Sequence, residues 1–195
     1  MRASKKMRAL LLPLFALAVG LRLQMTARSS PSSFVLLSNL QSGSNIGSIC
    51  RNCLAFNVTE VVVVGKPDFR GKMRQADRGA KARLAFINFP STSAAVDYLK
   101  NDKGCLMIGL EIMPTAKSLV DYHFPADRNV AFLLGNEGGG LNEAQRRACD
   151  DFVYIPQYSE GLASINVACC SAIVLQRYAE QAGYKESARV GEKFS

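Results

Sequence analysis

Apolar positions fall into short runs that alternate with helix-like segments from Phe34 onward. The clearest run is EVVVVG at 60–65, a β-branched segment that a glycine closes and that is short enough for a strand inside a sheet. Runs of the same kind predict further strands at 34–37, 84–89, 105–110, 129–135 and 152–155.

The segments between these runs predict helices at 45–56, 91–101, 141–149 and 164–182, and a loop at 156–163. Ser44 or Asn45 is available as the N-cap of the first helix, and Ser164 as the N-cap of the last, because short polar side chains accept hydrogen bonds from the first helical turn. Asn166 is then a polar position in that turn. Gly183 provides a stop signal for the last helix.

Strands that alternate with helices predict an α/β domain, in which a largely parallel sheet carries helices on both faces. Ligands of such sheets bind at the carboxyl ends of the strands. The 195 residues suffice for one domain with a substantial core, and neither an internal repeat nor an interdomain linker divides them. We therefore expect one domain at 34–184 and a short C-terminal tail at 185–195.

The first 33 residues differ from this body and predict a targeting leader. Basic residues at 2, 5, 6 and 8 precede an apolar run at 9–21, and Ala16 and Ala18 form a small-residue cleavage pattern. The run is too short for a comfortable transmembrane span. The segment 25–33 is rich in serine, contains Arg28 and lacks acids, as organellar transit peptides do.

A signal-like segment followed by a transit-like one is typical of the two-part plastid leaders of algae with complex plastids. We favour a plastid over a mitochondrion as the destination, and we expect no stable membrane association after the leader is removed. If translation starts at Met25, the protein is instead cytoplasmic.

The net charge of +8 comes mainly from the leader. Of the 24 lysines and arginines, six precede Phe34, whereas the first of the 16 acids is Glu60, so the body carries only about +2. A basic stretch remains at 66–83, where seven basic residues face only Asp68 and Asp77. Such a stretch neutralises RNA phosphates by releasing counterions, or it is simply a solvated loop.

Three polar or glycine-rich segments are candidates for chemistry. The first, NIGSICRN at 45–52, places Arg51 about two turns into a helix. Its guanidinium is a planar fork of donors suited to phosphate, although a surface arginine is the plainer interpretation. The second, LLGNEGGGL at 133–141, sets Glu137 between a buried strand and three glycines. It is neither a P-loop nor a dinucleotide fingerprint, because the lysine and the glycine spacing are missing.

The third segment, IPQYSEGLASINV at 155–167, opens the last helix with Ser164 and Asn166. Together, in this order, the three segments resemble motifs 1, 2 and 3 of the SpoU/TrmH family of RNA ribose 2′-O-methyltransferases in the SPOUT superfamily. The resemblance covers about 34–184. The family usually has Ser-Leu-Asn-Val in motif 3, where this chain has Ile165, a volume-conserving difference.

The resemblance implies a SPOUT-type parallel sheet with a C-terminal deep trefoil knot around 134–140 and 155–166. It implies S-adenosylmethionine as cofactor, a homodimer, and RNA as substrate, with tRNA favoured over rRNA. The cofactor-binding residues carried over by motif are Leu134, Gly135, Asn136, Ile155, Gln157 and Ile165.

The resemblance also implies that Arg51 contacts the RNA phosphate or the hydroxyl and promotes deprotonation, while Asn45, Glu137, Ser164 and Asn166 orient Arg51 and the ribose. Electrostatic activation is preferred over arginine as the literal base, because its pKa lies far above neutral. The remaining RNA contacts are expected from the basic stretch, at Arg70, Lys72, Arg74 and Arg78. No metal site is expected. The alternative function is a SPOUT-fold RNA-binding protein that has lost catalysis.

Cys50 and Cys53 flank Arg51 in a Cys-x-x-Cys arrangement that favours compact core packing, with a redox-sensitive site as the alternative. His123 is expected in a loop, without a catalytic role.

Overall fold

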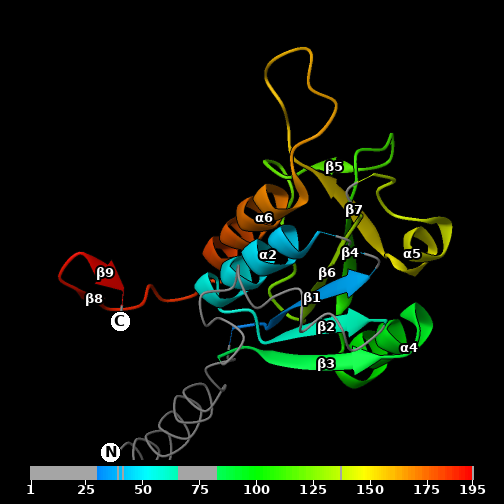
Figure 1. Ribbon diagram of the computed structural model, residues 1–195. Helices are drawn as coiled ribbons and strands as arrows, with labels where there is room; N and C mark the ends of the chain where they lie inside the picture. The colour runs from blue at the N-terminus through cyan, green and yellow to red at the C-terminus, as the bar shows by residue number, and fades with distance from the viewer. Residues whose placement is uncertain (1–29, 39, 41, 66–82, 137, 195) are drawn as a thin grey trace, which may run out of the picture.

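The computed structural model describes residues 30–38, 40, 42–65, 83–136 and 138–194. Within them, seven strands form one parallel sheet in the order β3-β2-β1-β6-β4-β7-β5 (Figure 1). The strands are β1 (Ser33–Ser38), β2 (Glu60–Val64), β3 (Ala85–Phe89), β4 (Leu106–Leu110), β5 (Lys117–Ser118), β6 (Val130–Leu134) and β7 (Asp151–Tyr154). The predicted α/β class and parallel sheet are confirmed.

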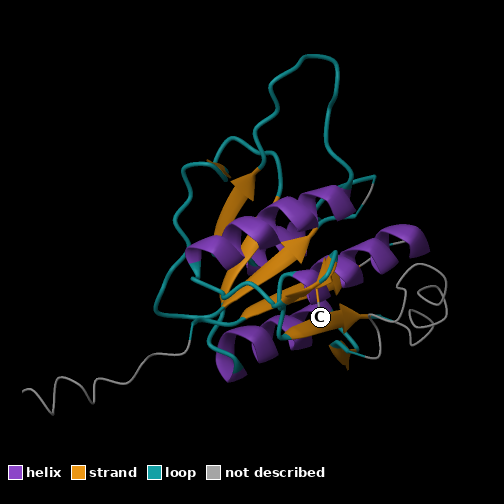
Figure 2. Cartoon of the chain, turned by 90° about the vertical axis from the view of Figure 1, so that its left-hand side faces the viewer, coloured by secondary structure: helices purple, strands orange, loops and turns teal. Residues whose placement is uncertain are grey.

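Helices cover both faces of the sheet, as the view in Figure 2 shows. On one face lie α2 (Gly43–Ala55) and α6 (Val167–Gln181), and on the other lies α4 (Thr92–Asp97), which continues into the π-helical turn η2 (Tyr98–Asp102). The short α5 (Glu143–Ala148) follows the glycine-rich segment. A small hairpin, β8 (Arg189–Val190) and β9 (Lys193–Phe194), occupies the tail.

The core consists of two layers because side chains alternate across each strand. On β1, Val35 and Leu37 pack toward α2 and α6, whereas Phe34 and Leu36 pack toward α4 and η2. Strand β6 is buried at every position. This burial on both faces explains why the strands read as continuous apolar runs.

Strand β6 lies between β1 and β4, in the middle of the sheet. The direction in which successive strands are added to the sheet reverses at this point, although all the strands stay parallel. Strands β1, β2 and β3 extend to one side of this point, and β4, β7 and β5 to the other. The carboxyl ends of β4, β6 and β7 therefore meet beside the switch point, where ligands of α/β sheets bind.

The predicted N-caps are wrong for two helices. Helix α2 is capped by Ser42, whose Oγ accepts from N of Asn45 at 3.4 Å, instead of by Ser44 or Asn45. Helix α6 begins at Val167, and Asn166 is its N-cap, whereas Ser164 lies three residues before the helix. The stop at Gly183 is confirmed, since this residue follows α6 with φ of +68°.

The chain before β1 is attached to the body. Tyr178 and Tyr184 donate hydrogen bonds from Oη to the carbonyl O of Pro31 at 3.0 and 2.8 Å, and N of Ser32 donates to Oδ1 of Asn129 at 2.8 Å. Ser33, expected at the end of the leader, is the first residue of β1. The rest of the predicted leader, residues 1–29, lies outside the described residues.

None of the helices in the described part of the chain has the length and apolar character needed to cross a membrane.

Candidate functional site

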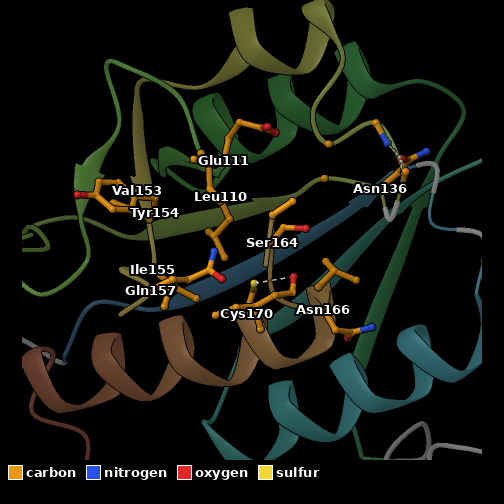
Figure 3. A pocket seen from close by; sticks show the side chains of 18 residues that line it. Leu110, Glu111, Asn136, Val153, Tyr154, Ile155, Gln157, Ser164, Asn166 and Cys170 are labelled. Carbon is orange, nitrogen blue, oxygen red and sulfur yellow. Dashed lines mark hydrogen bonds between the residues drawn. The ribbon is translucent and has the colours of Figure 1, made fainter. Parts of the chain in front are cut away.

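A cavity of about 450 Å³ opens at the carboxyl ends of β4, β6 and β7 (Figure 3). Its walls come from residues 110–112 after β4, from the glycines and Asn136 after β6, from the end of β7, and from residues 163–167 at the start of α6. The segment between β7 and α6 extends away from the body in both overall views (Figures 1 and 2). A parallel sheet concentrates these loops at one edge, so segments far apart in sequence share one cavity.

The glycine-rich loop after β6 is a closed backbone structure. Asn136 and Gly140 exchange two backbone hydrogen bonds of 3.1 and 3.2 Å, and Oδ1 of Asn136 accepts from N of Gly138 and N of Gly139 at 2.9 and 2.7 Å. A Cβ on Gly135 would lie 2.7 Å from the carbonyl carbon of Gly140. Gly135 therefore permits a backbone approach that any side chain would block.

Glu111, which follows β4 directly, is a cavity residue that the sequence reasoning missed. Its Oε2 accepts a hydrogen bond of 2.7 Å from N of Leu141, and its Oε1 lies 3.6 Å from Nη2 of Arg146. The sequence signal that could have identified Glu111 is its position, an acid directly after a buried parallel strand. The carboxyl ends of such strands form the edge of the sheet where ligands bind.

Most of the residues expected to bind a cofactor line the cavity: Gly135, Asn136, Ile155, Gln157 and Ile165. The side-chain oxygen of Asn136 is already engaged within the loop, because Oδ1 accepts the two hydrogen bonds from N of Gly138 and N of Gly139. Leu134 is not among the lining residues; its side chain is fully buried between the sheet, α2 and α6.

The first and third motifs meet at the cavity edge. Nδ2 of Asn166 donates to Oδ1 of Asn45 at 3.1 Å, and Ser164 and Asn166 both line the cavity. Nearby, Nδ2 of Asn52 donates to the carbonyl O of Ala168 and to Oγ of Ser171 at 2.8 and 2.9 Å. These bonds dock α2 against the start of α6. The structure thus brings Asn45 into contact with Asn166, and it places Ser164 and Asn166 in the wall of one cavity.

Arg51 is not brought to the cavity of its own chain. It is exposed on α2, and its side chain makes no hydrogen bond or ion pair with the residues that the structure describes. Glu137 lies outside the described residues, between Asn136 and Gly138 in sequence. The expected RNA contacts Arg70, Lys72, Arg74 and Arg78 also lie outside them.

The expected core packing of Cys50 and Cys53 is confirmed, since both side chains are fully buried. Burial raises the pKa of the Cys53 thiol well above its usual range, which disfavours the reactive thiolate. His123 is an exposed loop residue, as expected, and its Nδ1 lies 2.9 Å from the carbonyl O of Asp121. Among the described residues, no three His, Cys, Asp or Glu side chains are grouped to hold a metal ion.

Comparisons with known proteins identify the family. The sequence model of the SpoU rRNA Methylase family matches residues 32–176. The chain is 26% identical over 159 residues to the 23S rRNA (guanosine-2′-O-)-methyltransferase RlmB of Coxiella burnetii, covering 79% of this chain and 60% of that protein. A Staphylococcus aureus protein assigned to the TrmH family of tRNA/rRNA methyltransferases is 25% identical over 155 residues, covering 78% and 60%. The chain thus spans about three fifths of the length of these relatives.

Solved structures share the fold. The SpoU methyltransferase AviRb of Streptomyces viridochromogenes, solved in complex with AdoMet, matches with a TM-score of 0.68 and 23% identity, covering 81% of this chain and 63% of that one. The TrmH/SpoU tRNA modifying enzyme of A. aeolicus matches with a TM-score of 0.67 and 18% identity, covering 80% and 77%. With the glycine-rich loop, the Asn45–Asn166 contact and the family match in agreement, the chain belongs to the SpoU rRNA methylase family.

Proposed function

We propose that this protein transfers a methyl group from S-adenosylmethionine to a ribose 2′-hydroxyl of RNA. The observation that carries the proposal is the cavity at the carboxyl edge of the sheet. Residues of the second and third motifs line it, and Asn45 of the first motif joins its edge through the hydrogen bond from Asn166. Its volume falls in the range of about 300–1,000 Å³ that is typical of small-ligand sites. Family membership supplies the reaction class.

The residues of the cavity fit this cofactor. Leu110, Val153, Ile155 and Ile165 offer apolar surface for an adenine ring, and Gln157 adds a polar group. The glycines leave the loop backbone open to close contact, since a Cβ at Gly135 would collide with the loop itself. When bound, the sulfonium supplies an activated methyl group.

The polar residues at the cavity edge have the task of orienting the ribose. A 2′-hydroxyl is a poor nucleophile at neutral pH, so the site has to place it in line with the methyl group and help to remove its proton. Asn45, Ser164 and Asn166 offer hydrogen-bonding groups there. Arg51 contributes a permanent positive charge that stabilises a developing alkoxide or binds the neighbouring phosphate.

A homodimer follows from the position of Arg51 in this proposal. Because Arg51 does not line the cavity of its own chain, the arginine of one protomer serves the cavity of its partner. The deep trefoil knot expected from the resemblance, around 134–140 and 155–166, is also part of the proposal. Mixed dimers test the shared site: co-purified Arg51→Ala and Asn166→Ser chains should regain activity well above that of either variant dimer. Mixed dimers without regained activity would place both residues in a site of one chain.

The RNA substrate is proposed as tRNA in preference to rRNA, with the basic stretch 66–83 as an additional contact to phosphates. To test the activity, the full-length chain is incubated with tritiated S-adenosylmethionine and separate tRNA and rRNA fractions. Label recovered in a 2′-O-methylated nucleoside supports the proposal and identifies the RNA class. Cofactor binding without transfer to either fraction favours the alternative of an inactive RNA-binding protein. If S-adenosylmethionine does not bind, the methyltransferase proposal is wrong.

The plastid destination of the leader stays a separate proposal. Residues 1–33 fused to a fluorescent protein should direct it to the plastid of an alga with complex plastids. Accumulation in the mitochondrion or in the cytoplasm would refute the plastid assignment.

A further inference from the structure

We propose that Glu111 is a positioning residue that holds the end of the glycine-rich loop, residues 138–141, in its ligand-binding shape before the methyl donor arrives. This inference rests on the proposed function, because it assigns Glu111 a role in binding S-adenosylmethionine. The motifs that define the family resemblance do not include this residue.

The carboxylate of Glu111 braces the end of the loop. Its Oε2 accepts a hydrogen bond of 2.7 Å from N of Leu141, the residue that joins the loop to the capped start of α5. The Leu141 side chain is 2% exposed and packs in the core layer on the α4 side of the sheet. A buried side chain and a charge-assisted hydrogen bond therefore fix the same residue from two sides.

The carboxylate of Glu111 occupies the space that a side chain at position 140 would need. A Cβ on Gly140 would lie 2.6 Å from Oε2 of Glu111, and Gly140 has φ of +64°. The missing side chain gives the carboxylate room to approach the loop backbone, and the glycine adopts the left-handed conformation at low cost. In Figure 3 the Glu111 side chain extends away from Ile155 and Gln157, toward the chain that leads into α5.

The carboxylate has little other solvation. The Glu111 side chain is 15% exposed, and its second oxygen lies 3.6 Å from Nη2 of Arg146 on α5. A mostly buried carboxylate without partners is unfavourable, so the Leu141 N–H and the Arg146 guanidinium stabilise its placement. Among the cavity-lining residues that the structure describes, Glu111 alone carries a charged side chain.

These contacts imply that residues 138–141 of the loop are ordered in advance. The start of the loop is fixed by the backbone pair of Asn136 and Gly140, and its end by Glu111. Without the carboxylate, the Leu141 N–H loses its acceptor and the loop has to be ordered when the ligand binds. Ordering a loop during binding lowers affinity, so Glu111 acts on S-adenosylmethionine through the loop.

The test compares Glu111→Ala and Glu111→Gln in the full-length chain, with the dissociation constant for S-adenosylmethionine measured by calorimetry. Alanine should raise the constant about tenfold, since a partly buried N–H is left without an acceptor. Glutamine keeps an acceptor oxygen and should stay within about threefold of the wild type. The matched control is Glu143→Ala, because Glu143 is 71% exposed and forms an exposed ion pair with Arg147 on the same helix.

Hydrogen exchange of the wild-type protein provides a second measurement that needs no variant. The Leu141 amide should be protected before S-adenosylmethionine is added, and Glu111→Ala should lose this protection while strand amides keep theirs. Unchanged affinity in Glu111→Ala, or an unprotected Leu141 amide in the free wild type, would overturn the inference. Failure of the wild type itself to bind S-adenosylmethionine would instead refute the proposed function.

Discussion

Nδ2 of Asn166 donates a hydrogen bond of 3.1 Å to Oδ1 of Asn45, although the two residues are 121 positions apart. The same Asn166 side chain caps α6, because its Oδ1 accepts from N of Ala168 at 2.8 Å. One side chain therefore sets the start of α6 and ties it to the first turn of α2 at the cavity edge.

Substitution of Asn166 should separate these two roles. Asn166→Ser keeps a good N-cap, so its free energy of unfolding should stay within about 0.5 kcal/mol of the wild-type value. Serine is too short to reach Asn45, so the rate of methyl transfer should fall at least about tenfold. Asn166→Ala loses the cap as well and should cost about 1 kcal/mol of unfolding free energy. Urea unfolding and single-turnover methylation measure the two effects. Full activity in Asn166→Ser would show that the contact with Asn45 is only structural.

Arg51→Ala should impair catalysis without weakening the fold. The side chain is exposed, so the unfolding free energy of the variant should stay within about 0.5 kcal/mol of the wild-type value. Methyl transfer should fall by about a hundredfold or more, as for the loss of a group that assists proton removal. Binding of S-adenosylmethionine should change little. Arg147→Ala, at an exposed position of α5, is the control; equal activities of the two variants would remove Arg51 from the mechanism.

The glycine-rich loop should tolerate a methyl group at one position and reject it at another. In Gly135→Ala the new Cβ would lie 2.7 Å from the backbone of Gly140, so the loop has to shift and S-adenosylmethionine binding should be lost. Gly138→Ala meets its nearest neighbour, Oδ1 of Asn136, at 3.9 Å and should bind normally. Calorimetry on both variants checks this difference, and equal affinities would contradict the loop geometry.

The buried thiols should resist alkylation in the folded protein. Burial raises the pKa of Cys53 well above its usual range and that of Cys105 to about 12, so the nucleophilic thiolate is scarce at pH 8. Iodoacetamide should therefore leave Cys50, Cys53 and Cys105 unmodified until the protein is unfolded. Mass spectrometry of native and urea-treated samples distinguishes the states. Rapid native labelling of Cys50 or Cys53 would revive the redox interpretation.

Residues 31–33 should contribute to stability even if a leader is removed before them. A chain that begins at Ser30 keeps the acceptors for Tyr178 and Tyr184, whereas one that begins at Phe34 leaves the buried Tyr178 hydroxyl without Pro31 or Ser32. The shorter chain should lose about 1–3 kcal/mol of unfolding free energy. Urea unfolding of the two chains checks this, and Tyr178→Phe in each provides the control. Equal stabilities would place the domain boundary at Phe34.

The amino-acid sequence by itself determined the α/β class and most of the elements. Runs such as Val61–Val63 are apolar at every position because both faces of a parallel sheet are buried, so their pattern can be read locally. The two-residue β5 could not be found in this way, because two residues carry no periodicity. Helix starts were misplaced, since Ser164 and Asn166 are both good caps and only the packed chain shows which one turns into the helix.

The three motifs also indicated the family and many of the residues that line the cavity. A tight loop requires glycine at particular positions, such as Gly135, so that part of the site can be read from the sequence. Only the tertiary structure decided how these segments meet. It joined Asn45 to Asn166, buried Leu134 in the core, left Arg51 outside its own cavity and set Glu111 against the loop. These relationships depend on contacts between strands and helices far apart in the chain. Their distances follow from strand order and packing, which no local pattern of residues encodes.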